Sequence, residues 1–376
     1  MKTNLLQKNI PKDWSVKKIK DLLDFEQPTK YIVESSSYTS TGKTAVLTAN
    51  KSFILGYTNE TGGIYTNTPA IIFDDFTTDS KYVDFPFKVK SSAIKILTNR
   101  DKNTDLKFVY EIMKSFNFPI ANHKRHYISQ YQELDIVVPL INEQKKIAEI
   151  LSSVDKGIQK VDEIIVSNKK LKDGLVRELF DFKSKKDIKL MSLGEIGKVS
   201  MCKRIFREQT SNTGDIPFYK IGTFGKKADA FISKELFDTY RNKFSFPKVG
   251  DVLLSASGTI GRKVKYDGDP AYFQDSNIIW LEHDESKILN DFLFYLYETI
   301  RWETSGSTIK RLYNNAFLKE IVPVPTIDIQ KKMVNVLSAV DQKILLNKNL
   351  KEKLTLLKKG LMSDLLSGKV RTINNK

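Results

Sequence analysis

PLINEQKKIAEILSSVD, residues 139–155, and PTIDIQKKMVNVLSAVD, residues 325–341, decide the fold of this chain, because they are two copies of one helix entrance. With an offset of 186 positions, residues 139–180 align with residues 325–366 without a gap and share about 15 identities. A match of this length indicates an internal duplication. The chain therefore consists of two half-copies, each a globular part followed by a similar long helix.

Apolar residues in both helix copies step by threes and fours, which is the spacing of a coiled coil. About 40 residues make a rod of about 60 Å, and two such rods bury their stripes as an antiparallel pair with the globular parts at opposite ends. Asn168 and Asn347 interrupt the stripes, either to fix the register or because they lie at the exposed edge. The predicted seam consists of Ile147, Leu151, Val154, Ile158 and Leu171 in the first copy and Leu337, Val340, Ile344, Leu354 and Leu361 in the second.

Both globular parts mix short β-rich runs with turns and helical patterns, so each is of α/β type. The predicted fold class is α+β, with two α/β-type domains separated by two long antiparallel coiled-coil helices in a pseudo-twofold internal repeat. The predicted divisions are a first domain at 1–138, a first spacer helix at 139–182, a second domain at 183–324, a second spacer helix at 325–368 and a tail at 369–376.

The composition favours a polyanionic partner. The 376 residues include 61 Lys and Arg against 45 Asp and Glu, a net charge of +16, which suits nucleic acid and also an acidic membrane surface. The single cysteine, Cys202, excludes an internal disulfide and favours the reducing cytoplasm. No apolar run approaches the roughly 20 residues of a membrane span.

Basic, aromatic and amide residues cluster in the predicted loops, the mixture that holds phosphates and reads base edges. For any single one, a solvated surface charge is the alternative. The repeated KRxY pattern at Lys124 and Lys310 could equally be a structural pair that supports the helix entrance. The candidate DNA-binding residues are Lys51, Tyr57, Asn59, Lys124, Arg125 and Tyr127 in the first part, and Lys203, Arg204, Arg207, Lys220, Lys226, Lys227, Arg262, Lys263, Lys310, Arg311, Tyr313 and Asn314 in the second.

The sequence carries no complete catalytic or metal-binding pattern. TGKT at Thr41 lacks the first glycine of a phosphate-binding loop. SGTIG at Ser257 is either a cradle for a backbone phosphate or an ordinary strand–turn–strand. His123 and His126 lie three apart but lack accompanying ligands at metal spacing. The sequence therefore predicts a binding protein with no catalytic residue, no metal and no cofactor of its own.

The arrangement resembles the specificity subunit of type I restriction-modification systems over nearly the whole chain. The motifs that carry the resemblance are the two P-x-I-x-x-Q-K-K helix entrances, PKDWSVKKIKDL at Pro11, GDVLLSASGTIG at Gly250, SGSTIKRL at Ser305 and LLSGKVRT at Leu365. In the first half the expected glycine turn is replaced, near AIIFDDFTTDS at Ala70.

The resemblance implies that each globular part is a target-recognition domain that reads one half of a split double-stranded DNA target. It also implies two adenine methyltransferase subunits as partners, with restriction subunits in the full complex. S-adenosylmethionine, ATP and magnesium would then belong to those partners, and the chain itself would not be an enzyme. The alternatives are a stand-alone two-domain DNA-binding regulator, a protein scaffold and an intrinsic nuclease.

Overall fold

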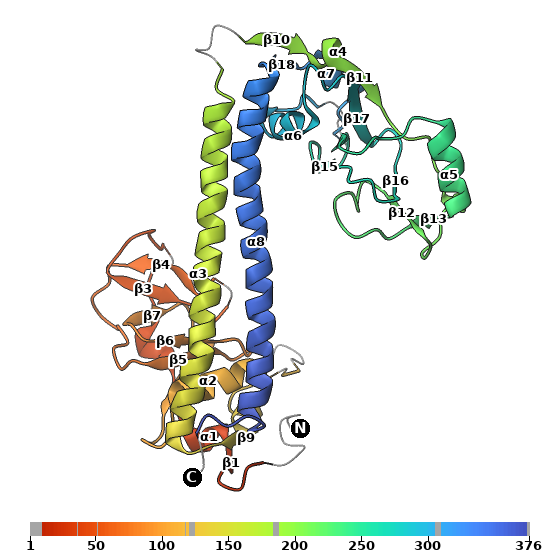
Figure 1. The fold of residues 1–376 in the computed structure, drawn as a ribbon. Coiled ribbons are helices and arrows are strands. Elements are labelled where there is room, and N and C mark those ends of the chain that lie inside the picture. Colours follow the sequence, from red (N-terminus) through yellow and green to blue (C-terminus); the bar gives the residue numbers. More distant parts are fainter. Residues whose placement is uncertain are drawn as a thin grey trace. The chain divides into compact units, whose positions relative to one another are not determined.

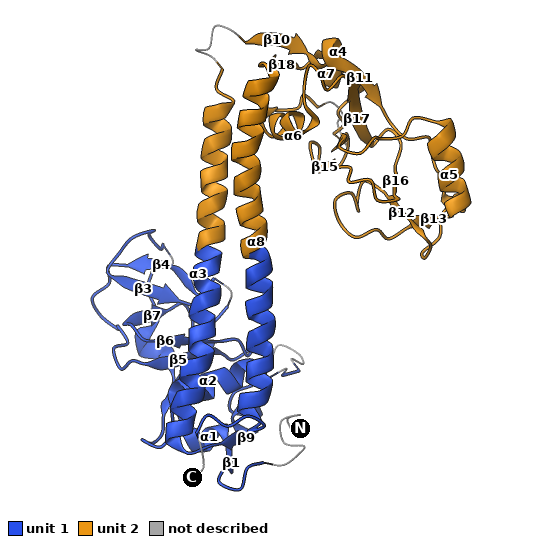
Figure 2. Ribbon diagram, in the orientation of Figure 1, with its two compact units in different colours: residues 1–163, 348–376 blue, residues 164–347 orange. Residues whose placement is uncertain are grey.

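The computed structural model describes residues 10–35, 37–50, 52–116, 118–119, 125–182, 188–304 and 310–373. Two compact units make up the chain, as Figure 2 shows: unit 1 contains residues 1–163 and 348–376, and unit 2 contains residues 164–347. Each unit holds one globular part and a segment of each long helix. Residues 10–138 of unit 1 are called the first module below, and residues 188–324 of unit 2 the second module.

The first module is built on two sheets and one separate strand pair. The four-stranded antiparallel sheet has the order β2 (Leu23–Glu26), β8 (Ile94–Asn99), β5 (Ala70–Asp74) and β6 (Ser80–Val83). In the second sheet β3 (Thr44–Leu47) pairs antiparallel with β4 (Ile54–Thr58) and parallel with β7 (Phe87–Val89). The separate pair and the short helices are β1 (Ser15–Lys18) with β9 (Asp135–Val138), α1 (Ile19–Leu22), η2 (Pro28–Tyr31), α2 (Leu106–Ser115) and η3 (Tyr131–Glu133).

The second module repeats this topology strand for strand. Its four-stranded antiparallel sheet has the order β11 (Gly197–Ser200), β17 (Ile278–His283), β14 (Val252–Ser255) and β15 (Lys263–Lys265). In the smaller sheet β12 (Ile216–Tyr219) pairs antiparallel with β13 (Phe231–Ile232) and parallel with β16 (Tyr272–Phe273). The remaining elements are β10 (Lys189–Ser192) with β18 (Ile321–Val324), α4 (Leu193–Ile196), η4 (Arg207–Gln209), α5 (Lys234–Lys243), α6 (Asn290–Thr299) and α7 (Asn314–Lys319).

The two long helices are α3 (Ile141–Leu179) and α8 (Ile327–Leu366), which run side by side in Figure 1. Early residues of α3 meet late residues of α8 in unit 1, where Asp155 pairs with Lys358, and late residues of α3 meet early residues of α8 in unit 2, where Lys172 pairs with Asp341. The helices are therefore antiparallel, and the predicted α+β fold class with its internal repeat is confirmed.

The seam of the coiled coil follows the prediction except at one residue. Ile147, Leu151, Leu337, Val340 and Ile344 are buried, and Val154, Ile158, Leu354 and Leu361 are partly buried. Leu171, however, is 52% exposed, so its assignment to the seam is wrong. A heptad pattern drifts by about 20° per repeat around a straight helix. That drift accounts for the outward position of Leu171, while its neighbour Lys172 points to the partner helix.

The amide of Asn347 donates to the carbonyl of Lys343 in its own helix at 2.8 Å. This contact favours the edge interpretation of Asn347 over a register-fixing pair.

A buried glutamine near the start of each long helix holds the neighbouring module. Gln144 accepts from the backbone of Asp105 at 2.9 Å and donates to the carbonyls of Asn103 and Pro139. Gln330, its repeat partner, does the same with Leu289, Lys287 and Pro325. Each amide thus satisfies two backbone groups just before α2 or α6 and one just before its own long helix, which explains why the helix entrance is duplicated with its glutamine.

Hydrophobic cores in each unit run from the module into the helices. In unit 1, Leu22, Phe108 and Tyr131 cluster with Ile147 of α3 and Leu365 of α8. Each helix segment is therefore part of the core of its unit and not a separate rod.

Candidate nucleic-acid interface

The connection between β14 and β15 in the second module is a tight glycine turn. Ser255 closes it: its backbone N–H donates to the Arg262 carbonyl at 2.8 Å, and its hydroxyl donates to the Thr259 carbonyl. Gly258 and Gly261 adopt φ values of 64° and 84°, which favour glycine. The strand–turn–strand alternative therefore describes the backbone at SGTIG, and the turn tip at Gly258 and Thr259 is exposed.

The KRxY segment of the second module is attached to this turn. Leu312 donates its backbone N–H to the Ala256 carbonyl at 2.8 Å, and Ser257 and Arg311 form a β-bridge. The Arg311 guanidinium donates to the carbonyl of Ser276, a residue with a positive φ of 54°. This attachment brings four predicted residues beside the turn: Lys310, Arg311, Tyr313 and Asn314. The side chain of Tyr313 is 54% exposed.

Arg262 joins a second loop to the same turn. Its guanidinium donates to the Phe224 carbonyl at 3.0 Å, and Lys226 and Lys227 follow in that loop with exposed side chains. Lys220, at the start of the loop, is paired with Asp229 at 2.9 Å. Arg262 and Lys220 thus have partners in the protein, although Lys220 stays 42% exposed, whereas the side chains of Lys226 and Lys227 are exposed.

Two further predicted residues, Lys203 and Arg204, lie on the segment before η4, and a third, Arg207, is the first residue of η4. Arg204 pairs with Asp275, next to Ser276, at 3.0 Å, and Lys203 lies over the Phe244 ring at 5.3 Å. Arg207 is exposed at the start of η4. Through Asp275 and Ser276 this segment reaches the Arg311 side of the turn, so the second module gathers most of its predicted basic residues around one feature.

Lys263 is the exception in the second module. Its side chain is only 11% exposed, its ammonium pairs with Glu298 of α6 at 2.8 Å, and it lies over the Phe294 ring at 3.7 Å. Burial lowers the pKa of Lys263 to about 8, although Glu298 opposes this. The assignment of Lys263 to DNA contact is therefore wrong: alternation along β15 turns its side chain onto α6.

The first module places its turn differently. Between β5 and β6 the Asp74 carboxylate accepts from the backbone N–H groups of Phe76 and Thr77, both at 2.9 Å. Thr78 takes the left-handed conformation, with φ of 59°. The aspartate side chain thus closes the β5–β6 turn by hydrogen bonds, whereas the β14–β15 turn of the second module closes through its glycines. This difference explains why the β5–β6 turn has no glycine. Arg125 is exposed and lies over the Phe76 ring at 5.9 Å.

Tyr127 is a core residue, and its assignment to DNA contact is wrong. The side chain is fully buried, 5.2 Å from the Phe73 ring, and its backbone N–H donates to Asp75 at 2.8 Å. Burial raises the pKa of Tyr127 above its ordinary value. Tyr127 therefore has the structural role that was the alternative for the KRxY pattern, because its buried ring anchors the segment before β9. Its repeat partner Tyr313 is exposed.

The other first-module candidates are less concentrated. Tyr57 is partly buried on β4, where its backbone pairs with Thr39, and exposed Asn59 accepts from the Lys43 backbone at 3.3 Å. Lys51 and Lys124 lie outside the described residues.

Four residues at these turns were missed from the sequence: Phe76 and Thr77 in the first module, and Ser276 and Asn277 in the second. Asn277 accepts from the hydroxyl of Ser257 at 2.8 Å, and the Ser276 carbonyl orients Arg311. Alignment of the β5–β6 connection with the β14–β15 connection would have found the first pair. Nothing local marks Ser276 or Asn277.

Within the residues that the structure describes, no cluster of three or more His, Cys, Asp or Glu side chains is arranged to hold a metal ion. His123 lies outside those residues, and His126 is buried. None of the described helices combines the length and apolarity of a membrane span.

Residues 11–166 and 185–356 both match the type I restriction modification DNA specificity domain. The chain belongs to this family. The matches cover both modules and most of both helices, as the internal duplication requires. The family confirms the predicted class, a DNA specificity subunit of a type I restriction system and not an enzyme.

Relatives of this specificity subunit support the assignment. A protein of Haemophilus influenzae, described as a candidate type I restriction enzyme specificity subunit, is 37% identical over 258 residues, 66% of this chain and 67% of its own length. The EcoR124I/EcoR124II specificity subunit of Escherichia coli is 43% identical over 190 residues, 47% of each chain. The chain therefore spans about half to two thirds of these relatives in the matched regions.

The fold is shared with a solved type I restriction-modification S subunit from M. genitalium, at 22% identity and a TM-score of 0.68. The comparison covers 96% of this chain and 97% of that chain. At this identity the likeness concerns the fold alone.

Proposed function

We propose that each module of this specificity subunit reads one half of an asymmetric, bipartite double-stranded DNA target. The observation that carries the proposal is that the two modules share one strand order but present different turns. The second module offers Arg311, Tyr313 and Lys226 around a glycine turn, and the first offers Arg125 and Phe76 around an aspartate-closed turn. A common frame with different reading residues suits two different half-sites.

The experiment is a module exchange. Replacement of residues 188–324 by the corresponding part of a relative with a known target should change one half-site and leave the other intact, as mapped by modified adenines in a genome after co-expression with a methyltransferase. A change in both halves would contradict independent modules. The matched control replaces residues 10–138, which should change the other half.

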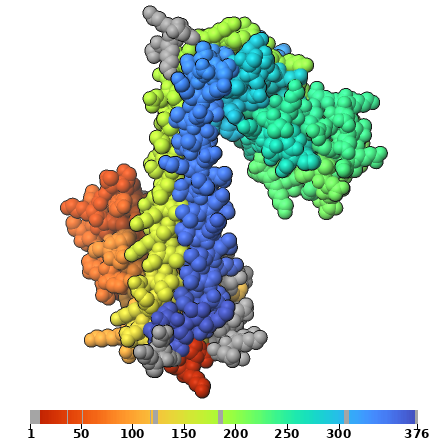
Figure 3. Space-filling model, viewed as in Figure 1, coloured from red at the N-terminus to blue at the C-terminus, as the bar shows by residue number. Residues whose placement is uncertain are grey.

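We also propose two adenine methyltransferase subunits as partners. Exposed apolar residues recur at equivalent places on both long helices: Ile164 and Leu171 on α3, and Leu350 and Leu357 on α8, each pair one heptad apart. These two pairs are called the exposed apolar strips, and Figure 3 shows that stretches of both helices are left uncovered on the face in view. Two equivalent strips suit two copies of one partner.

Paired substitutions test the stoichiometry. Ile164→Ser with Leu171→Ser should remove one methyltransferase copy from the purified complex, and Leu350→Ser with Leu357→Ser should remove the other, as measured by native mass spectrometry. Retention of both copies in both variants would contradict this use of the strips. Leu190→Ser, an exposed position on β10, is the control.

In this proposal the partner subunits bind the cofactors: the methyltransferases bind S-adenosylmethionine, and the restriction subunits bind ATP and magnesium. The absence of an apolar span among the described helices and the reduced state expected for Cys202 support a cytoplasmic location.

The alternative, a regulator that works without a methyltransferase, predicts tight site-specific binding by the chain alone. Either form of DNA binding should weaken steeply with salt, because phosphate contacts release counterions.

A further inference from the structure

Ion pairs connect α3 to α8 within both units. In unit 1 Asp155 meets Lys358 at 2.6 Å and Asp162 meets Lys351 at 2.7 Å. In unit 2 Lys172 meets Asp341 at 2.9 Å. The first and the last of these pairs are images of each other under the internal repeat, because Asp341 and Lys358 stand 186 positions after Asp155 and Lys172.

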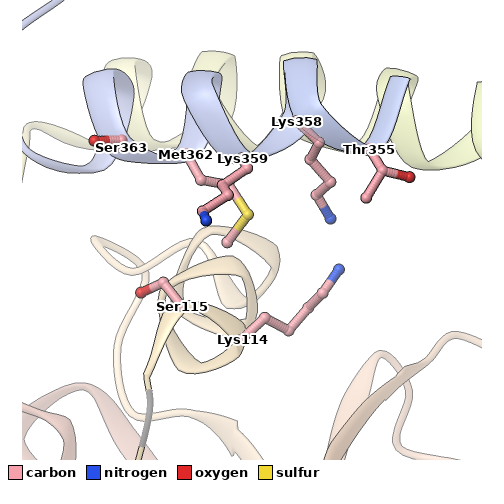
Figure 4. Close-up of a pocket in the computed structure, with 7 residues that line it drawn as sticks. All are labelled: Lys114, Ser115, Thr355, Lys358, Lys359, Met362 and Ser363. Carbon is pink, nitrogen blue, oxygen red and sulfur yellow. The ribbon is translucent and has the colours of Figure 1, made fainter. Parts of the chain in front are cut away.

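In unit 1 the repeated pair is part of a closed ring of alternating charges. Lys114 of α2 pairs with Asp155 at 3.0 Å and with Glu111 at 3.3 Å, and Glu111 pairs with Lys358 at 3.1 Å. Glu111 is fully buried and Lys358 nearly so. Figure 4 shows Lys114 and Lys358 reaching toward each other from α2 and α8, beside a cavity of about 640 Å³. These four residues are called the charge ring.

The charge ring favours the ionised forms of Asp155 and Lys114. Burial works against the charged form of Asp155, but Lys358 and Lys114 outweigh it and keep the pKa of that carboxyl below its ordinary value. The pKa of Lys114 is raised, because Glu111 and Asp155 overcome its own burial. One set of four charges therefore connects a module helix to both spacer helices.

Unit 2 makes the same three-way connection with other residues. Lys172 of α3 pairs with Glu298 of α6 at 3.2 Å as well as with Asp341 of α8. The Tyr295 hydroxyl of α6 donates to Asp341 at 2.9 Å. Lys263 completes the set by pairing with Glu298.

Buried and half-buried charges such as these contribute little net stability, because removing them from water offsets their attraction, and apolar replacements are often equally stable. Their attested use is to specify one register among several that an apolar seam allows. A slip of one heptad would set Asp155 against Leu365, and a slip in the other direction would set Lys358 against Ala148 and Asp341 against Ile165. Both leave a charge facing an apolar side chain.

We propose that the charge ring and its unit 2 counterpart are positioning residues for DNA recognition: they fix the register of α3 against α8 and the seat of each module on the helices, and thereby the accepted gap between half-sites. The proposal rests on the bipartite reading proposed above. It assigns to these charges a role in the gap alone, and none in the bases recognised.

The test separates position from stability. The apolar-ring variant carries Glu111→Leu, Lys114→Met, Asp155→Leu and Lys358→Met in unit 1, and Lys172→Met with Asp341→Leu in unit 2, because either set alone would hold the register. We expect it to fold with an unchanged or higher Tm and to bind both half-sites, but to lose its preference for one gap over gaps about three base pairs longer or shorter, the shift of about 10.5 Å that a slip of one heptad produces, from at least tenfold to within about threefold. Binding is measured on duplexes that differ only in the gap. The control removes an exposed ion pair of α3, with Lys146→Met and Glu149→Leu.

Cysteine cross-linking, measured without DNA, tests the register role separately from the proposed reading of bipartite DNA. A Cβ at Gly157 would lie 3.9 Å from the Leu354 side chain. Gly157→Cys with Leu354→Cys should therefore cross-link in the native register, and Gly157→Cys with Leu361→Cys should cross-link only after a slip of one heptad. We expect the second cross-link to form in the apolar-ring variant alone.

An apolar ring with unchanged gap preference and only the native cross-link would overturn the inference. If the apolar variant does not fold, the single variant Asp162→Lys and the swap Asp162→Lys with Lys351→Asp decide. The probe is then Gly157→Cys with Asn347→Cys, which reports the opposite slip, the one that takes position 162 away from Lys351 and sets Asp155 against Lys351. The single change should produce this cross-link and the swap should remove it, and its absence in the single variant overturns the inference. Slipped cross-links in a chain that binds no bipartite DNA would refute the proposed function and leave the register role intact.

Discussion

The two modules share one strand order and differ at the β5–β6 and β14–β15 turns, around which the candidate DNA-binding residues lie. Both modules have the same strand order and pairing directions, and each is held by a buried glutamine near the start of a long helix, Gln144 or Gln330. The β14–β15 turn depends on Gly258 and Gly261, whereas the β5–β6 turn depends on the carboxylate of Asp74. The comparison teaches that the repeated Gln144 and Gln330 make the same attachment in both modules, whereas the two turns are closed by residues that are not repeated.

The largest effect is expected from Gly261→Val. The residue has a φ of 84°, and an added Cβ would lie 2.9 Å from the Trp302 ring, so the turn and the Arg311 segment attached to it should rearrange. We expect binding to the second half-site to fall by at least about 100-fold, with the first unaffected, in competition assays with single half-site changes. Gly222→Ala, which has open space around it, is the control and should bind normally.

The next largest effect is expected from Arg371→Ala, which removes an ion pair with Glu143 that is found in unit 1 and not in unit 2. Arg371 pairs with the fully buried Glu143 at 2.9 Å, and the Trp14 indole donates to the same carboxylate at 3.0 Å. Loss of the guanidinium leaves the buried carboxylate with neutral donors alone, the Trp14 indole and the backbone N–H of Thr372, which should cost about 3 kcal/mol of unfolding free energy. In unit 2 the equivalent of Glu143 is Ile329.

Denaturant unfolding followed at unit 1 measures the Arg371→Ala cost. Lys369→Ala, which removes an exposed pair with Asp364, should change the unfolding free energy by less than about 1 kcal/mol. Equal effects of the two substitutions would contradict the special role of Glu143.

Arg311→Ala and Arg125→Ala compare the two turns directly. Each should weaken binding by about 1–3 kcal/mol if its guanidinium reads a base, and each should act on its own half-site only. Measured affinities for targets with one altered half-site decide this. A loss spread over both half-sites would mean that the modules are not independent.

The smallest effects are expected from Lys226→Ala and Lys227→Ala. Both side chains are exposed in the loop that Arg262 holds. As phosphate contacts they should each reduce the slope of log affinity against log salt by about 0.9 and leave the base preference unchanged. An unaltered salt slope would remove that lysine from the interface.

Much of the candidate site was predictable, because clustering of basic residues in loops survives folding. Lys226, Lys310, Arg311 and Tyr313 were identified from composition and repeat alone, and the structure brings the last three to one turn. Lys263 and Tyr127 were not predictable, since a residue type says nothing of which side of a strand or loop faces the core. Their neighbours Glu298 and Phe73 come from distant parts of the chain.

The sequence by itself determined the duplication, the two long helices, the α/β type of the modules and the family, because helical periodicity and repeated motifs are local patterns. Only the tertiary structure decided which member of each repeated pair is buried and which is exposed. Tyr127 and Tyr313 occupy equivalent positions, yet one fills a core and the other faces solvent. The reason is that burial depends on contacts between residues far apart in the chain, and in this protein those contacts differ between the copies even where the local sequence agrees.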